Sequence, residues 1–315
     1  MSTFKSRYTR RQFLQQLAVT GLSIVTSPVP GVTDNVIASR KTITKAIPST
    51  GESVPVIGMG SWLTFDVGDD MAARNARLKV LQTFFDQGGA VIDSSPMYGS
   101  SQEVIGYCLE RISNKSKLFA ATKVWMYGRK LGVMQMHSAE KLWNVSQFDL
   151  MQIHNMLDWE THLESLKAMK ADGRIRYIGI TTSHGRRHKQ LEQALLKEKF
   201  DFVQLTYNVL DREVEQRLLP IAKEKGIAVI ANRPFQRSGL FDYVAGKPLP
   251  VWAAEYECNN WAQFFLKFIV SHPAVTCAIP ATSRVDHMLE NMGAAYGRLP
   301  DEKFRARMAR YMNSL

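Results

Sequence analysis

The chain has 315 residues, of which 45% are hydrophobic and 22% are charged, which is enough to bury one large core. This composition excludes disordered and collagen-like proteins, and three scattered cysteines are too few for a disulfide framework or a thiolate zinc site. The formal net charge of +11 is spread along the chain without a basic run or a nucleic-acid motif. We therefore expect that the protein does not bind nucleic acid. A basic pocket for a small phosphorylated ligand would account for the positive charge.

The first residues have the layout of an export signal. Polar and basic residues occupy Ser6–Arg11, a mostly apolar stretch of about 14 residues follows, and Val36–Ala38 offers a cleavage site. Thr9–Leu14 (TRRQFL) resembles the twin-arginine export consensus. We therefore expect a signal peptide at residues 1–38, recognition by the twin-arginine translocase, a periplasmic location and no stable membrane insertion after cleavage. An amphipathic helix with two solvated arginines, or an uncleaved anchor, is the alternative.

From residue 41 the pattern changes to short extended segments. Two of them flank the turn-like cluster Ser49–Glu52 and predict a hairpin. Eight short apolar runs then recur and predict strands at Val56–Met59, Val91–Ile92, Leu118–Ala121, Leu150–Ile153, Tyr177–Ile180, Phe202–Leu205, Ala228–Ala231 and Val275–Ile279.

Between these runs lie segments with helical spacing, such as Arg77–Phe85 and Leu163–Lys170. Gly88, Gly173 and Gly226 stand where a C′ glycine would end three of the helices. Eight strand–helix units over about 260 residues predict a (β/α)8 barrel, and no G-x-G-x-x-G turn indicates the open dinucleotide-binding sheet. We assign residues 39–315 to one barrel domain with an N-terminal β-hairpin.

Three ionisable residues end successive strands. Asp93, Lys123 and His154 follow the second, third and fourth apolar runs, and strand carboxyl ends meet at one mouth of a barrel. Taken alone, the Asp is more often a helix cap, the Lys a solvated edge residue and the His a hydrogen-bonded core residue. Their serial placement favours an active site.

Tyr98 lies in the loop five residues after Asp93, with Gly99 beside it and Ser100 or Ser101 able to cap the next helix. Its side chain is either a lid residue or a general acid. A neighbouring ammonium lowers the pKa of a phenol, and Lys123 could supply it. With His154 as a second donor, these side chains suit a carbonyl oxygen that becomes an alkoxide.

The segments Asp93–Gly99, Ala121–Lys123, Leu150–Asn155 and Gly173–Ile180 resemble the catalytic segments and the fifth-strand approach of the aldo/keto reductase superfamily. The likeness covers about residues 41–295. It implies a (β/α)8 barrel closed at its base by a hairpin, and hydride transfer from a nicotinamide, usually of NADPH, to an aldehyde or ketone or in reverse. The catalytic residues it implies are Asp93, Tyr98, Lys123 and His154.

The resemblance also implies an NADP site, with NAD as the alternative. Gln204 stands where the family holds the nicotinamide carboxamide, Thr181 and Thr182 replace a common Ser-Asn pair, and Asn232 replaces a stacking aromatic residue. Arg233 is a candidate for the ring or the pyrophosphate, and the segment after Ile279 resembles the adenosine-binding segment. The implied set is Gly60, Ser61, Trp62, Thr181, Thr182, Gln204, Asn232, Arg233, Thr282, Ser283, Arg284, His287, Glu290 and Asn291.

Trp62, Trp125 and Tyr127 follow strand ends and are candidates for an apolar substrate pocket around a small carbonyl compound. No metal site is expected. Two other functions remain open at this stage: a catalytically weak nucleotide-binding barrel that acts as a partner or sensor protein, and a lyase that uses Lys123 as a Schiff-base nucleophile.

Overall fold

The computed structural model describes residues 41–315, and the predicted signal at residues 1–38 lies outside the described residues. A parallel sheet of eight strands forms the centre of residues 41–315, in the order β10-β9-β8-β7-β6-β5-β4-β3. Parallel bridges from Ile57 to Ala278 and from Gly60 to Ala281 join the two outer strands and close the barrel. The strands are β3 (Met59–Gly60), β4 (Val91–Asp93), β5 (Phe119–Val124), β6 (Phe148–Ile153), β7 (Ile175–Thr181), β8 (Phe202–Thr206), β9 (Ala228–Asn232) and β10 (Cys277–Ala278).

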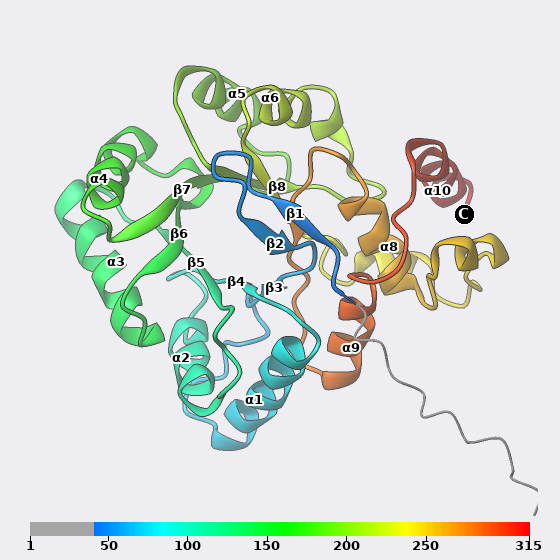
Figure 1. The fold of residues 1–315 in the computed structure, drawn as a ribbon, viewed down its shortest axis with the longest axis horizontal. Helices are drawn as coiled ribbons and strands as arrows, with labels where there is room; N and C mark the ends of the chain where they lie inside the picture. The colour runs from blue at the N-terminus through cyan, green and yellow to red at the C-terminus, as the bar shows by residue number, and fades with distance from the viewer. Residues whose placement is uncertain (1–40) are drawn as a thin grey trace, which may run out of the picture. The chain divides into compact units, whose positions relative to one another are not determined.

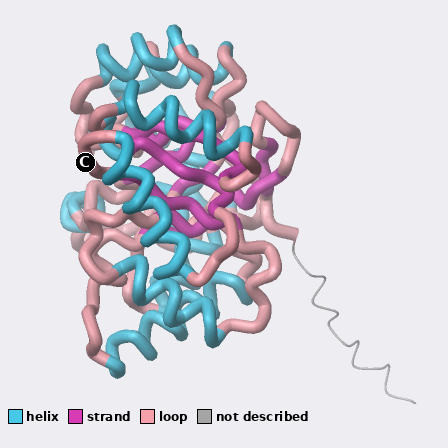
Figure 2. The backbone as a smooth tube through the Cα atoms, turned by 90° about the vertical axis from the view of Figure 1, so that its left-hand side faces the viewer, coloured by secondary structure: helices cyan, strands magenta, loops and turns pink. Residues whose placement is uncertain are grey.

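Helices surround these strands, as Figures 1 and 2 show. Their apolar faces pack on the outside of the barrel, and the strands are therefore buried on both faces. The helices are α1 (Met71–Asp86), α2 (Ser101–Arg111), α3 (Arg129–Trp143), α4 (Trp159–Ala171), α5 (His188–Lys197), α6 (Leu218–Glu224), α7 (Gly239–Tyr243), α8 (Trp261–Val270), α9 (Val285–Gly293) and α10 (Glu302–Ser314), with short 3-10 turns η1 (His154–Met156), η2 (Glu213–Glu215) and η3 (Val251–Tyr256).

The predicted hairpin is present as β1 (Thr44–Ala46) and β2 (Ser53–Pro55), an antiparallel pair that lies across one end of the barrel in Figure 1. Ile47 and Val54 of this hairpin belong to the apolar cluster that fills the barrel interior, together with Phe119, Tyr177 and Phe202. The hairpin therefore seals the end of the barrel where the strands begin, and it leaves the carboxyl ends of the strands as the open mouth.

The predicted helix stops at Gly88, Gly173 and Gly226 are confirmed, because each has a positive φ directly after the C-cap of α1, α4 and α6. The side-chain cap predicted for α2 is wrong. Ser100 is its N-cap residue, but its hydroxyl donates to Asp66 and accepts from the Gly68 amide, and thus serves the preceding loop.

Cys108, Cys258 and Cys277 are all free thiols in the apolar core, as expected. In the part of the chain from residue 41 onward, no helix is long and apolar enough to cross a membrane. Within the same residues, no group of three or more His, Cys, Asp or Glu side chains could hold a metal ion.

Candidate active site

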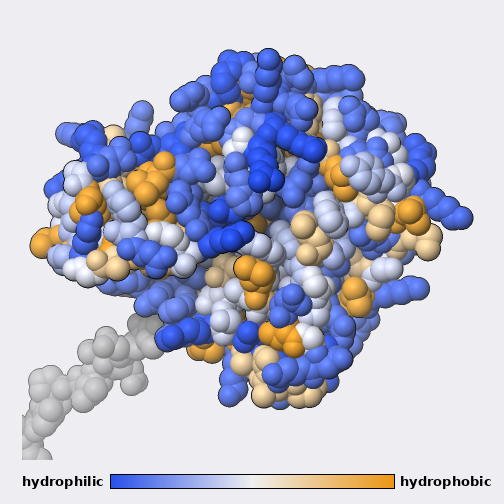
Figure 3. All heavy atoms as spheres, turned by 180° about the vertical axis from the view of Figure 1, so that it is seen from behind, coloured by the Kyte–Doolittle hydropathy of each residue, from blue (hydrophilic) through white to orange (hydrophobic). Residues whose placement is uncertain are grey.

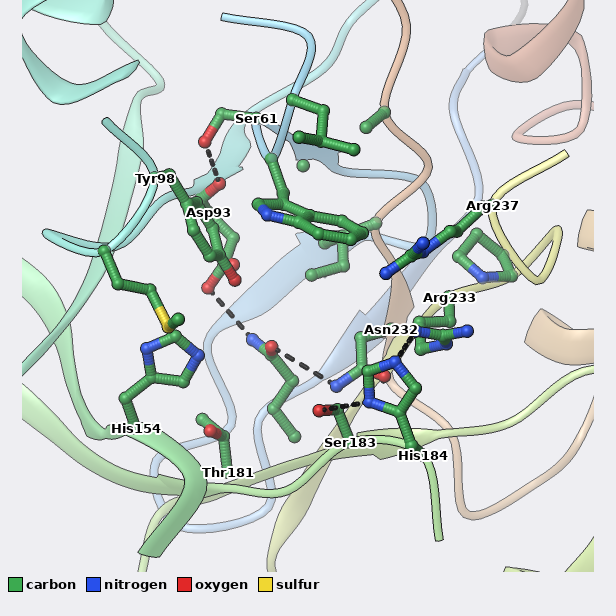
Figure 4. Close-up of a pocket in the computed structure, with 18 of the residues that line it drawn as sticks. Ser61, Asp93, Tyr98, His154, Thr181, Ser183, His184, Asn232, Arg233 and Arg237 are labelled. Atoms are coloured by element: carbon green, nitrogen blue, oxygen red, sulfur yellow. Dashed lines mark hydrogen bonds between the residues drawn. The ribbon is translucent and has the colours of Figure 1, made fainter. Parts of the chain in front are cut away.

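The mouth of the barrel brings together the residues that end successive strands. Asp93 is the last residue of β4, Lys123 is the last residue but one of β5, and His154 follows β6 directly. Figure 4 shows Asp93, Tyr98 and His154 facing the same cavity from three different segments. The sequence prediction that these side chains lie at one mouth is therefore met by the geometry.

The Asp93 carboxylate is the hub of a buried polar network. One oxygen, Oδ2, accepts a hydrogen bond from the Lys123 ammonium, which also donates to the Ser94 carbonyl over 2.8 Å. The other oxygen, Oδ1, accepts from Gln152 Nε2 at 2.8 Å and from Gln204 Nε2 at 2.9 Å. Both charges are buried and compensated, which fixes the position of the Lys123 ammonium.

Burial disfavours the charge of Lys123, but Asp93 and Tyr98 outweigh that effect and raise its pKa, so that the group stays an ammonium. Burial also raises the pKa of Tyr98, while the charge of Lys123 and a hydrogen bond from it act in the opposite direction. The sequence analysis predicted the lowering by Lys123, but in the structure burial outweighs it. Tyr98 is therefore a protonated phenol in contact with an ammonium.

His154 packs edge-on against the Tyr98 ring, with 5.7 Å between the ring centroids. Burial, aided by the positive charge of Lys123, lowers the pKa of His154 to about 2. The imidazole is therefore neutral at physiological pH. Its Nδ1 atom lies 2.8 Å from the hydroxyl oxygen of Ser95.

A cavity of about 360 Å³ opens at this mouth. Figure 3 shows this side of the molecule, where hydrophilic surface predominates. Eight of the residues predicted for the cofactor line the cavity beside Asp93, Tyr98 and His154: Gly60, Ser61, Trp62, Thr181, Thr182, Gln204, Asn232 and Arg233.

The other predicted residues lie outside the cavity lining. Trp125 and Tyr127 are on the loop between β5 and α3, and Tyr127 is 70% exposed. The side chain of Gln135 bonds both backbone groups of Trp125 and thereby fixes this part of the loop. Thr282, Ser283, Arg284, His287, Glu290 and Asn291 lie at the start of α9 and along it, and Arg284 is exposed and paired with Asp286.

Asn232 holds neighbouring strand ends together. Its Nδ2 atom donates to the Thr182 carbonyl over 3.0 Å, and its Oδ1 accepts from the Thr206 hydroxyl over 2.8 Å. The carboxamide thus ties the ends of β7, β8 and β9 and leaves no aromatic face at this position. Thr181 likewise has a structural partner, because its hydroxyl accepts from the Asn155 amide.

The residues around the cavity suit an anionic ligand with planar rings. Arg233 contacts His184, and the guanidinium of Arg237 lies 4.6 Å from the centroid of the Trp62 ring. Among residues 41–315 neither arginine forms an ion pair with a carboxylate, although the charge of Asp211 acts on Arg233 from a longer distance. The hydroxyl of Thr64, which also borders the cavity, is buried without a partner in this part of the chain. These features fit the phosphates and polar groups of a dinucleotide.

Several site residues escaped the sequence analysis. Gln152 lies on β6 two residues before His154, so strand alternation could have placed it on the same side of the sheet. Ser95, two residues after Asp93, carried a similar signal. His184 and Arg237 carried none, because both lie in loops and take positive φ angles of 63° and 67°.

The sequence from residue 56 to residue 309 matches the model of the Aldo/keto reductase family. The chain belongs to this family. It is an oxidoreductase of the aldo/keto reductase type, and its (β/α)8 barrel is the fold that the sequence predicted.

Individual relatives are distant. Methylglyoxal reductase YeaE of Escherichia coli (strain K12) is 24% identical over 253 residues, which cover 78% of this chain and 88% of that protein. Aldo-keto reductase YhdN of Bacillus subtilis (strain 168) is 25% identical over 203 residues, covering 59% of this chain and 60% of that protein.

Solved structures with the same fold have similarly low sequence identity to this chain. The aldo/keto reductase from Klebsiella pneumoniae in complex with NADP and acetate superposes with a TM-score of 0.71 at 23% identity, covering 83% of this chain and 93% of that one. A structure of an aldo-keto reductase from Klebsiella pneumoniae in complex with NADPH gives a TM-score of 0.72 at 22% identity, covering 87% and 95%.

Proposed function

We propose that this aldo/keto reductase reduces a small aldehyde or ketone with NADPH, or oxidises the alcohol in reverse, and that Tyr98 gives the proton to the carbonyl oxygen. The observation that carries the proposal is the convergence of Tyr98 and His154 on one cavity, with the Lys123 ammonium beneath it against the Tyr98 ring and held by the buried Asp93 carboxylate. Donors aimed at an oxygen that gains negative charge are the usual source of catalysis for such reactions.

Each residue has a separate task in this proposal. The raised pKa of Tyr98 keeps the phenol protonated at neutral pH, so its proton is available. The ammonium of Lys123 stabilises the phenolate that remains after transfer. The neutral imidazole of His154 donates a hydrogen bond to the same oxygen, and Gln152 and Gln204 keep Asp93 in place for Lys123.

NADPH would supply the hydride when bound. Gln204, Thr181 and Thr182 line the cavity where the nicotinamide amide would be held. Arg233 and Arg237 supply positive charge at the rim for the pyrophosphate. The NADP and NADPH complexes of Klebsiella proteins with this fold support the choice of cofactor.

The lyase alternative is disfavoured by the state of Lys123. A Schiff base requires a neutral amine, but the Asp93 carboxylate stabilises the ammonium and its pKa is raised. The nucleophile would have to leave a buried ion pair before it could react.

The test is to follow NADPH absorbance with the purified full-length chain and a panel of small aldehydes and ketones. We expect NADPH oxidation that depends on the carbonyl compound. NADPH binding without oxidation across the panel would overturn the reductase in favour of the partner-protein alternative. A borohydride-trapped adduct on Lys123 would overturn it in favour of the lyase.

Arg284 tests the preference for NADPH over NADH. The residue occupies the N-cap position of α9 without a side-chain cap bond and follows Thr282 and Ser283. We propose that this segment binds the 2′-phosphate, with His287, Glu290 and Asn291 toward the adenine. Its pair with Asp286 is exposed and therefore contributes little, so the guanidinium is free to rebind a phosphate. Arg284→Ala should weaken NADPH binding about tenfold and leave NADH binding nearly unchanged. Arg307→Ala, another exposed and paired arginine, is the control, and equal weakening of both cofactors would contradict the assignment.

We further propose that residues 1–38 direct export to the periplasm through the twin-arginine translocase. The TRRQFL motif at Thr9–Leu14 supports this. Replacing both Arg10 and Arg11 with lysine should leave the protein in the cytoplasmic fraction of an expressing bacterium. Unchanged fractionation of the double variant would reject the signal.

A further inference from the structure

Ser95 makes a buried contact with His154 that the catalytic scheme above does not use. The side chain is fully buried two residues after Asp93, and its Oγ atom lies 2.8 Å from His154 Nδ1. The same oxygen accepts a hydrogen bond from the Met97 amide over 3.3 Å. The serine thus joins the end of β4 to the imidazole that follows β6.

The number of protons available decides the direction of this contact. A serine hydroxyl has one hydrogen to donate, and a neutral imidazole has one N–H and one bare nitrogen. Within residues 41–315, His154 Nδ1 is the acceptor in reach of the Ser95 hydroxyl hydrogen, because the Met97 amide is itself a donor. Donation from Ser95 satisfies both groups and leaves the imidazole proton on Nε2.

The opposite arrangement is unfavourable on two counts. If Nδ1 carried the proton and donated to Ser95, the serine oxygen would accept from two donors and its own hydrogen would be unpaired in a buried place. The bare Nε2 lone pair would then be directed at whatever enters the cavity that His154 borders. A carbonyl oxygen there would be repelled.

We propose that Ser95 is a positioning residue that fixes the Nε2–H tautomer of His154 and thereby makes the imidazole a hydrogen-bond donor toward the cavity. The tautomer itself follows from contacts within the chain. Only the last step, donation to a substrate oxygen, rests on the proposed reductase function.

The direct test is ¹⁵N NMR of the histidines in the full-length chain, with the His154 signals assigned from a His154→Asn variant. We expect a bare, pyridine-like Nδ1 and a protonated, pyrrole-like Nε2 at neutral pH. A protonated Nδ1 in the parent protein would overturn the proposal.

Ser95→Ala removes the donor with little change in volume and should shift His154 toward a mixture of tautomers. Ser94→Ala is the matched control, because the hydroxyl of this neighbouring buried serine accepts from Ser61, whereas the serine bonded to His154 is Ser95. Ser95→Thr retains the hydroxyl and should restore the parent tautomer. An unchanged tautomer in Ser95→Ala would show that another group fixes it and would overturn the assignment.

Kinetics then separate this proposal from the proposed function. In Ser95→Ala we expect kcat for carbonyl reduction to fall about tenfold, with the Kd for NADPH unchanged by fluorescence titration and with rescue by Ser95→Thr. If the parent reduces no carbonyl compound while its tautomer still depends on Ser95, the proposed function fails and the positioning role stands. If the parent reduces carbonyl compounds but neither kcat nor the His154 tautomer changes in Ser95→Ala, the proposed function stands and the positioning role fails.

Discussion

Buried ionisable side chains at the mouth are held in fixed protonation states by their surroundings. His154 is kept neutral by burial and by the nearby Lys123 charge, whereas Lys123 is kept charged because Asp93 outweighs its burial. One group that stays neutral and one that stays charged, both beside the Tyr98 phenol, give a proton donor with a fixed hydrogen-bonding environment. The stability of the fold must then depend on pH through His154.

The pKa of His154 falls from 6.5 to about 2 on folding. Between these values the unfolded chain binds a proton at this residue and the folded chain does not, so the free energy of unfolding decreases as the pH is lowered below about 6.5. We expect the parent to lose about 1.4 kcal/mol per pH unit relative to His154→Asn over this window. Urea unfolding of both proteins at pH 7, 6 and 5 measures the difference. Parallel pH profiles would contradict a buried neutral imidazole.

Some of the site residues could be predicted from the sequence and others could not. Asp93, Lys123 and His154 could be found because each ends an apolar run, and the barrel brings strand ends together. Gln152 and Ser95 act through hydrogen bonds across neighbouring strands, and such contacts depend on strand register and rotamer. Asn232 was recognised as a departure from the family, but its ties to Thr182 and Thr206 required coordinates.

At the scale of elements, close packing of helices around the barrel requires small residues at particular points. Gly106 of α2 lies against the backbone carbonyl of Leu142 in α3, where a Cβ atom would overlap the oxygen. Gly239, at the start of α7, has only ordinary contacts around its Cβ position. Intrinsic helix propensity favours alanine by about 1 kcal/mol in the interior of a helix, where Gly106 lies, and by less at the first position, where Gly239 lies.

These two glycines give opposite predictions for one substitution. Gly106→Ala should lower the free energy of unfolding by about 1–3 kcal/mol, because α2 and α3 must move apart. Gly239→Ala should leave it unchanged or raise it slightly. Denaturant unfolding curves of the two variants decide the point, and a Gly106→Ala protein as stable as the parent would show that the helices are not in close contact there.

Loops at the mouth were the least predictable elements. His184, Arg233 and Arg237 take left-handed backbone angles, which cost energy for non-glycine residues and are sustained by surrounding contacts. Trp125 and Tyr127 follow a strand end, as a pocket residue would, yet both side chains are exposed and neither lines the cavity. The path of a loop depends on tertiary contacts such as those of Gln135, and these contacts cannot be predicted from the sequence pattern.

For the whole molecule, the architecture was predictable because every strand of a closed parallel barrel is covered on both faces and reads as a short apolar run. Eight such runs alternating with helical segments leave few other folds. The hairpin at the base of the barrel could also be predicted, because the turn-like cluster Ser49–Glu52 lies between two short extended segments. Ile47 and Val54 join the hairpin to the barrel strands through the interior apolar cluster, and a second, larger cluster joins the strands to the helices.

The reactivity of the three cysteines tests whether the apolar core stays closed to solvent. All are buried, and burial raises the pKa of Cys108 to about 12, of Cys258 to about 11 and of Cys277 to about 12. Because the thiolate is the reactive form, a disulfide reagent such as dithionitrobenzoate should label none of them in the native protein and all three in guanidinium chloride. Fast labelling of one thiol without denaturant would indicate that its part of the barrel opens independently.

The central claim, that the Tyr98 phenol is the proton donor, is tested most directly by Tyr98→Phe, which removes the hydroxyl and keeps the ring against Trp62 and His154. Carbonyl-dependent NADPH oxidation should fall at least about 100-fold, while the Kd for NADPH stays within about twofold, because the hydroxyl is not expected to hold the cofactor. Tyr107→Phe, whose hydroxyl bonds Asn75 on the surface, should behave like the parent. Turnover by Tyr98→Phe equal to that of the parent would contradict the account.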